Sequence, residues 1–102
     1  MSSAKLILEI ISGPLDGFRV ELEKEENWSC QGKSSLVFPW DLKLGSPQAR
    51  IFPEAEAWWI EGHKAPHGTY IFNAQHKVEE KIRLEEGEVL KASSTWIRVI
   101  SC

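Results

Sequence analysis

The sequence predicts an all-β protein, a sandwich of two mostly antiparallel, twisted sheets with about eleven short strands. Short runs rich in β-branched and aromatic residues alternate with turn-forming residues along the chain. No stretch shows sustained helical periodicity, and the turn signals recur at the short spacing typical of sandwiches. The 102 residues are expected to form one domain, 1–102, because smaller pieces could not bury a core.

The first two strands are predicted from an apolar run and an alternating run. Residues 5–11 open as a strand, and two glycines in 12–17 suit the turn that follows because glycine adopts positive φ readily. Phe18, Val20 and Leu22 alternate with charged residues, so we expect all three to face the core.

The next strands are shorter. Trp28 and Cys30 share one face of a strand that ends at Gly32. Residues 36–38 make a further strand, which Pro39 is expected to end because proline lacks the backbone donor.

A hairpin is predicted from residues 49–52 and 57–60, joined by an acidic turn at 53–56. Successive strand residues point to opposite faces, so one of Trp58 and Trp59 should lie in the core and the other outside it.

The remaining strands follow the same pattern to the end of the chain. They are expected at residues 69–72, 81–84, 88–91 and 95–101, with turns at 73–76 and 85–87. Within the last of them, Trp96 fits an alternating core position, as does Trp28 in its own strand.

Composition excludes several classes of function. The formal net charge of −3 argues against nucleic-acid binding, which needs a basic face. Cys30 and Cys102 provide neither a disulfide framework nor a zinc spacing, and reduced thiols are expected. No apolar run approaches a membrane span and the N-terminus has no signal-like stretch, so a cytoplasmic location without direct membrane binding is predicted.

Catalysis is not expected either. His63, His67 and His76 fall in predicted loops, where an i, i+4 spacing does not align ligands, and Glu61 is the only further ligand type close by. No serine lies in a nucleophile elbow, and no glycine-rich phosphate loop precedes a helix. The sequence therefore predicts no metal, no cofactor and no enzyme activity.

Five motifs in order resemble those of a forkhead-associated (FHA) domain and span nearly the whole chain. They are Gly13-Pro14-Leu15-Asp16-Gly17; Gly32-Lys33; Asp41 with Gly45-Ser46-Pro47-Gln48-Ala49; His67-Gly68-Thr69-Tyr70; and Leu84-Glu85-Glu86-Gly87-Glu88. The resemblance implies the FHA sandwich and a protein-interaction module, whose loops read phosphothreonine peptides in the family.

Several family ligands are replaced here. Lys33 stands in place of an arginine that grips phosphate through two donors, and Gly45 in place of a serine that donates a hydroxyl, although Ser46 could substitute for it. His67 replaces an asparagine that clamps the peptide backbone, and Gln48 replaces a histidine that braces the loop from within. Asn73 is displaced by one position from the family's asparagine.

The size of these losses favours one of two functions. Weakening two or three charge-assisted hydrogen bonds removes about 3–6 kcal/mol of binding free energy, or about two to four decades of affinity. We therefore predict a degenerate FHA domain that serves as a phospho-independent scaffold, with Gly68 and Thr69 kept as frame. The alternative is a phosphothreonine reader with altered ligands, using Lys33, Ser46, Arg50 and His67 as an anion pocket.

Surface residues of the expected loops suggest an interface. Lys33, Lys43, Arg50 and Lys64 form either a solvated basic surface or a site for an anion or an acidic partner. Exposed indoles are common hot spots in binding interfaces. The interface candidates are therefore Trp40, one of the pair Trp58 and Trp59, and the lysines Lys43 and Lys64.

Among degenerate FHA-like domains, the chain resembles the cytoplasmic N-terminal domain of the inner-membrane ring protein of bacterial type III secretion systems. The segment from Leu44 to Ala49 carries this resemblance. It implies that the domain docks a cytosolic sorting-platform component and that a transmembrane helix follows beyond Cys102.

Overall fold

The chain forms eleven strands and one 3-10 turn in the part that the structure, a computed structural model, describes: residues 5–32, 35–45, 48–62, 68–71, 76–78 and 80–102. In chain order the elements are β1 (Leu6–Ile10), η1 (Gly13–Leu15), β2 (Arg19–Leu22), β3 (Glu26–Ser29), β4 (Leu36–Val37), β5 (Ala49–Glu54), β6 (Ala57–Gly62), β7 (Tyr70–Ile71), β8 (His76–Lys77), β9 (Ile82–Arg83), β10 (Val89–Ala92) and β11 (Thr95–Ser101).

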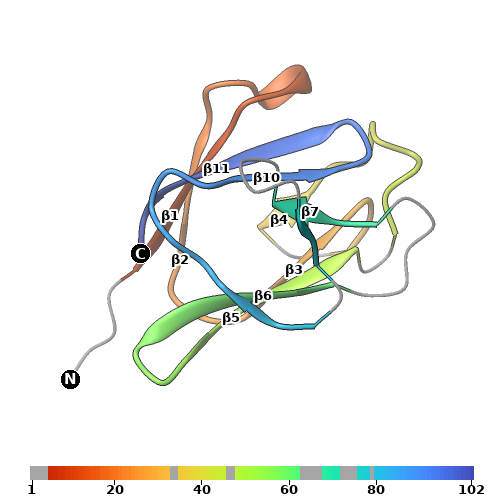
Figure 1. Cartoon of the computed structure of the whole chain (residues 1–102). Helices are drawn as coiled ribbons and strands as arrows, with labels where there is room; N and C mark the ends of the chain where they lie inside the picture. Colours follow the sequence, from red (N-terminus) through yellow and green to blue (C-terminus); the bar gives the residue numbers. More distant parts are fainter. Residues whose placement is uncertain (1–4, 33–34, 46–47, 63–67, 72–75, 79) are drawn as a thin grey trace.

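The strands build two sheets that pack face to face (Figure 1). One sheet has the order β2-β1-β11-β10-β7-β8 and the other β4-β3-β5-β6-β9. The short β3–β4 pairing is parallel, whereas the other described pairings, including the long ones of β1 with β11 and of β5 with β6, are antiparallel. The predicted all-β sandwich is confirmed.

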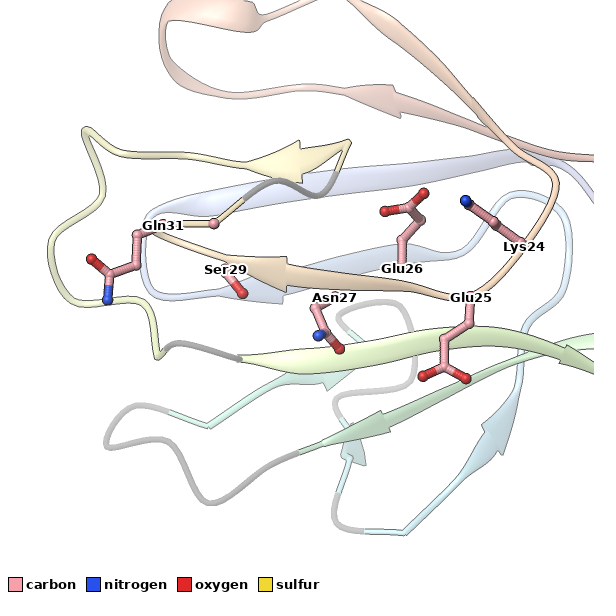
Figure 2. Close-up of a pocket in the computed structure, with 7 residues that line it drawn as sticks. Lys24, Glu25, Glu26, Asn27, Ser29 and Gln31 are labelled. Atoms are coloured by element: carbon pink, nitrogen blue, oxygen red, sulfur yellow. The ribbon is translucent and has the colours of Figure 1, made fainter.

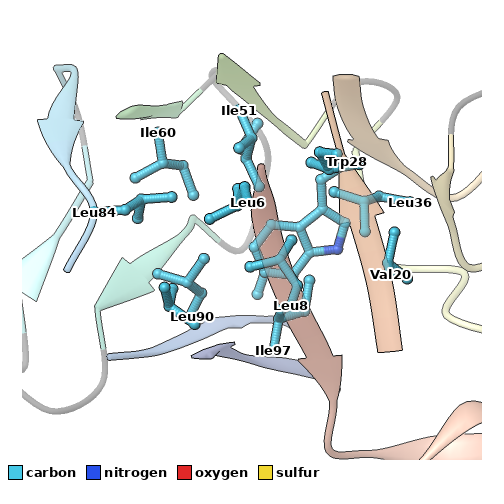
Figure 3. Close-up of a cluster of buried hydrophobic side chains, with 14 of the residues drawn as sticks. Leu6, Leu8, Val20, Trp28, Leu36, Ile51, Ile60, Leu84, Leu90 and Ile97 are labelled. Atoms are coloured by element: carbon cyan, nitrogen blue, oxygen red, sulfur yellow. The ribbon is translucent and has the colours of Figure 1, made fainter. Parts of the chain in front are cut away.

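The core lies between the sheets and is made by alternate residues of the facing strands. Leu6, Leu8 and Ile10 point inward from β1, and Trp28 lies among them at 0% exposure (Figure 3). Ile60 contributes from β6, and Leu84 contributes from the position directly after β9. Successive residues of a strand point to opposite faces, so the buried residues of each strand also identify the residues on its outer face.

Trp96 is the main error of the inside-outside prediction. In β11 the buried residues are Thr95, Ile97 and Val99, so Trp96 lies on the outer face of the six-stranded sheet. Both Trp96 and Ile97 are apolar, so hydrophobicity alone did not fix the phase of the strand. The pairing of buried Ala92 with buried Thr95 across the β10–β11 hairpin fixes it.

Phe18 was also expected in the core and is 56% exposed. It precedes β2 and belongs to the turn after η1, where its amide donates to the Leu15 carbonyl and its own carbonyl accepts from Ile10. Val20 and Leu22 do face the core as predicted. The alternation of β2 therefore starts one residue later than the sequence pattern indicated.

Strand β8 was missed, since His76 was expected in a turn. Its backbone pairs with β7 in antiparallel register. Asn73 lies outside the described residues.

No helix within the described segments has the length and apolar character needed to span a membrane.

The β5–β6 turn is tighter than predicted. Pro53 lies within β5, and Glu54 pairs with Ala57, so the turn has only two residues, Ala55 and Glu56. Their φ values are 54° and 61°, which is a two-residue turn of the type that favours Asn-Gly. Both are residues for which the left-handed region is unfavourable.

Replacing Glu56 by glycine should therefore raise the free energy of unfolding by about 1 kcal/mol, because glycine adopts positive φ without a Cβ clash. Urea unfolding would measure the change. The matched control is Glu86→Gly, at a residue that does not adopt positive φ, which should lower stability instead. Equal effects of the two substitutions would contradict strain at the β5–β6 turn.

Candidate functional site

The loop before β5 and the loop before β7 are joined by one buried side chain, Gln48. Its carboxamide oxygen accepts from the Gly45 amide at 2.8 Å. Its nitrogen donates to the Gly68 carbonyl and to Thr69 Oγ1, both at 2.9 Å. Gln48 is 0% exposed, so these hydrogen bonds are made away from water.

The orientation of this carboxamide is fixed by its partners. The Gly45 amide can only donate and the Gly68 carbonyl can only accept, so the oxygen of Gln48 must face the first and its nitrogen the second. Three of the predicted site residues, Gly45, Gly68 and Thr69, are thereby brought together. Gln48 therefore braces the loop from within, at the position where it replaces the family's histidine.

Asp41 ties the same loop to the other sheet. One carboxylate oxygen accepts from Ser93 Oγ at 2.8 Å, and the other accepts from the Ser94 amide at 3.0 Å and from Thr95 Oγ1 at 2.7 Å. Asp41 is 6% exposed. The β10–β11 turn therefore belongs to the site, because its hydroxyls hold the carboxylate around which the loop is built.

The pKa of Asp41 lies below its ordinary value of 3.8. Burial acts to raise the pKa, but the hydrogen bonds from Thr95, Ser93 and Ser94 favour the charged form and outweigh burial. The backbone of Lys43 adds a further hydrogen bond that lowers the pKa. The carboxylate is thus ionised at neutral pH and is occupied by its neighbours.

Arg50 lies in a strand, as the predicted hairpin strand at residues 49–52 requires, although its charge was grouped with those of the loop lysines. It is the second residue of β5, on the outer face of the five-stranded sheet, where its guanidinium contacts Glu61 at 2.9 Å and Glu25 at 3.3 Å. The same group lies over the Phe52 ring, 4.0 Å from its centroid. Two carboxylates and an aromatic ring therefore hold Arg50, the one described residue of the predicted anion pocket of Lys33, Ser46, Arg50 and His67.

A hollow of 380 Å³ follows β3 up to Gly32, the residue before Lys33 (Figure 2). Its charged lining is one lysine, Lys24, against two glutamates, Glu25 and Glu26. Glu26 also accepts from the Ser35 amide at 3.2 Å. An acidic lining of this kind repels a phosphate, so the described side of this hollow does not resemble an anion site.

The structure places some of the interface candidates at the surface and one of them in the core. Trp40 is 41% exposed and packs edge-on against Phe38, and Lys43 is exposed. Trp58 is in the core at 3% exposure, so Trp59 is the residue of the pair that lies outside. Its indole donates to the Glu54 carbonyl at 2.9 Å and is covered in part by Lys81.

Four predicted site residues lie outside the described residues. They are Lys33, Ser46, Lys64 and His67. The described residues contain no group of three or more histidine, cysteine or acidic side chains placed to hold a metal ion.

The fold is that of FHA domains. The solution structure of the FHA domain of an Arabidopsis thaliana hypothetical protein matches with a TM-score of 0.83 and 20% identity, covering 100% of this chain and 91% of that one. The FHA domain of the CT664 protein from Chlamydia trachomatis matches with a TM-score of 0.79 and 16% identity, covering 97% and 99%.

A third match is an FHA domain from a study of phosphothreonine-dependent FHA interactions, with a TM-score of 0.81 and 16% identity over 97% of this chain and 98% of that one. No protein-family model and no curated protein matches the sequence. At these identities the similarity establishes the architecture and leaves the function to be argued from the residues.

The sequence prediction missed the contribution of Ser93, Ser94 and Thr95. Three hydroxyl residues in a row, at a predicted gap between two strands, are a signal for side chains that bond to a neighbouring loop. Their partner, Asp41, is more than fifty positions away in the chain, so the pairing itself required the structure.

Proposed function

We propose that this domain is a non-catalytic protein-interaction module that acts as a phospho-independent scaffold in a larger assembly. The FHA fold supports an interaction module, and the altered ligand positions, Lys33, Gly45 and His67, argue against strong phosphate binding. The loop frame, by contrast, is held by buried side chains. A loop frame that is kept while its phosphate-binding side chains are replaced suits a docking surface better than a phosphate-binding site.

The state of Arg50 is the observation that carries the proposal. A phosphothreonine reader built from Lys33, Ser46, Arg50 and His67 needs the Arg50 guanidinium for the phosphate, yet Glu25 and Glu61 already bind it. A phosphate would have to displace both carboxylates while they repel it. Of the other three residues of this pocket, only Lys33 carries a permanent positive charge.

The test is to restore the family ligands. The triple variant Lys33→Arg, Gly45→Ser and His67→Asn should bind phosphothreonine peptides at least ~100-fold more tightly than the unchanged protein, because two or three charge-assisted contacts are regained. Isothermal titration calorimetry with a phosphothreonine peptide library would measure the affinities. Micromolar, phosphate-dependent binding by the unchanged protein would overturn the proposal.

The finer assignment is also part of the proposal. We infer a cytoplasmic domain of a type III secretion inner-membrane ring protein, whose partner is a component of the cytosolic sorting platform. The resemblance of Leu44 to Ala49 supports it. The alternative is a phosphothreonine-binding FHA domain of a signalling protein, as the phosphothreonine-dependent interactions of one structural neighbour suggest.

A further inference from the structure

A second hollow, of 480 Å³, lies at the β10–β11 turn and is lined by Lys43, Tyr70, Lys91, Ser93 and Ser94. We call it the Lys43–Lys91 hollow. Strand register explains how its members meet. Tyr70 on β7 pairs with Lys91 on β10, and Lys91 pairs in turn with Trp96 on β11, so the three side chains form a row across the outer face of the sheet. Lys43 is one of the interface candidates and Tyr70 ends the fourth FHA-like motif, whereas Lys91 belongs to neither set.

Among the described residues, no carboxylate forms an ion pair with either lysine of this hollow. Lys5, Arg50, Lys81 and Arg98 all pair with carboxylates, but within the described segments no carboxylate lies at ion-pair distance from Lys43 or Lys91. The Lys91 ammonium lies 5.6 Å from the centroid of the Trp96 ring, which holds it toward this face.

Asp41 contacts the two serines of the lining, and its two carboxylate oxygens are occupied by Ser93, Ser94 and Thr95. The lining therefore presents two ammonium groups with hydroxyl groups around them.

The hollow is also held in shape. Ser93 has a φ of 55°, a region that favours glycine, and its hydroxyl donates to Asp41. The turn thus keeps a serine at a position where glycine would be less strained. Leu42, next to Lys43 in the chain, is 84% exposed, and Tyr70 is 37% exposed. Apolar surface therefore accompanies the positive charge.

We propose that the Lys43–Lys91 hollow docks an acidic, unphosphorylated segment of a partner protein, whose carboxylates contact the two lysines while an apolar side chain beside them contacts Leu42 and Tyr70. Charge complementarity supports this occupant, since the hollow is positive in a domain with a net charge of −3. Flexible, widely spaced carboxylates suit two separate ammonium groups, whereas a single phosphate is best held by converging donors such as the arginine fork. This inference rests on the proposed scaffold function and names its surface.

The experiment uses the whole chain and a defined probe, an N-acetylated and C-amidated peptide of two glutamates, one leucine and two glutamates. Amide NMR spectra should show shifts centred on Lys43, Tyr70, Lys91, Ser93 and Ser94 at low salt. The same peptide with glutamine in place of glutamate should bind at least ~10-fold more weakly, since the ammonium groups lose their counter-charges.

Charge reversal locates the site. Lys91→Glu and Lys43→Glu should each weaken binding of the glutamate peptide about tenfold. Lys24→Glu is the matched control: it makes the same change in net charge at an exposed lysine of the hollow beside Gly32, and it should leave the affinity within about twofold. Equal loss in all three variants, equal binding of the two peptides, or shifts centred elsewhere would each overturn the proposal.

A third arm separates this proposal from the scaffold function on which it rests. A phosphothreonine peptide that shifts the Gly45 and Gly68 amides with micromolar affinity would refute the phospho-independent function. It would leave the mapping of the glutamate peptide to the Lys43–Lys91 hollow intact. A glutamate peptide that fails to bind would refute the docking site alone.

Discussion

Replacing Asp41 by alanine should lower the free energy of unfolding by about 3–5 kcal/mol, a large part of the total for a domain of this size. The carboxylate accepts from Ser93, Ser94 and Thr95, and each hydrogen bond to a charged group contributes about 1.5–3 kcal/mol, without full additivity. The substitution leaves the Ser94 amide and the buried Thr95 hydroxyl without their acceptor. Urea unfolding at pH 7 would measure the loss.

The effect of Asp41→Ala should depend on pH in a defined direction. The folded pKa of Asp41 is lower than 3.8, so its stabilisation is complete above the unfolded pKa and is lost as the pH falls through the folded pKa. The difference in stability between the unchanged protein and Asp41→Ala should therefore narrow below about pH 4.

Asp16→Ala, at an exposed aspartate of the β1–β2 turn, is the matched control. It should change stability by less than about 0.5 kcal/mol at any pH. A difference between Asp41→Ala and the unchanged protein that stays constant from pH 7 to pH 3 would contradict the role assigned to this carboxylate.

Gln48→Ala should cost about 2–4 kcal/mol and should loosen both loops that the side chain joins. The change removes three hydrogen bonds and leaves the Gly45 amide and the Gly68 carbonyl unsatisfied. Chemical denaturation would give the stability, and hydrogen exchange of the Gly45 amide would report the loop. The stability and the exchange rate should change together, because the Gln48 side chain stabilises both loops.

Two further variants sharpen the test of Gln48. Gln48→Glu keeps the acceptor for Gly45 but cannot donate to Gly68 when ionised, so it should be less stable at pH 7 than at pH 4.5. Gln31→Ala, at an exposed glutamine, should have little effect. If Gln48→Ala left the Gly45 amide as protected as before, the bridge between the loops would not hold them.

The fold was largely predictable because most strands can be recognised from the local sequence pattern. The alternation in β1 and the turn glycines Gly13 and Gly17, whose φ values are 69° and 92°, needed no tertiary information. The errors arose where local pattern was ambiguous. Trp96 and Ile97 are equally apolar, and only cross-strand pairing decides which of them is buried.

The candidate site was predictable in its parts but not in its connections. The motifs identified Gly45, Gly68 and Thr69 and put Gln48 at a bracing position, but they did not show that its carboxamide joins Gly45 to the other two residues. Arg50 falls in the strand predicted at residues 49–52, but its charge was grouped with the loop residues as an anion ligand. Its pairing with Glu61 depends on β5–β6 register, which a charge count along the chain does not contain.

We propose that the loop frame survives while its phosphate-binding function does not. An amide NMR titration tests this on the unchanged protein with one peptide prepared in two forms, with threonine and with phosphothreonine. The phosphorylated form should cause no saturable shift of the Gly45, Gly68 and Thr69 amides at micromolar concentrations. Saturable shifts of those amides by the phosphorylated form alone would show that phosphate binding is retained.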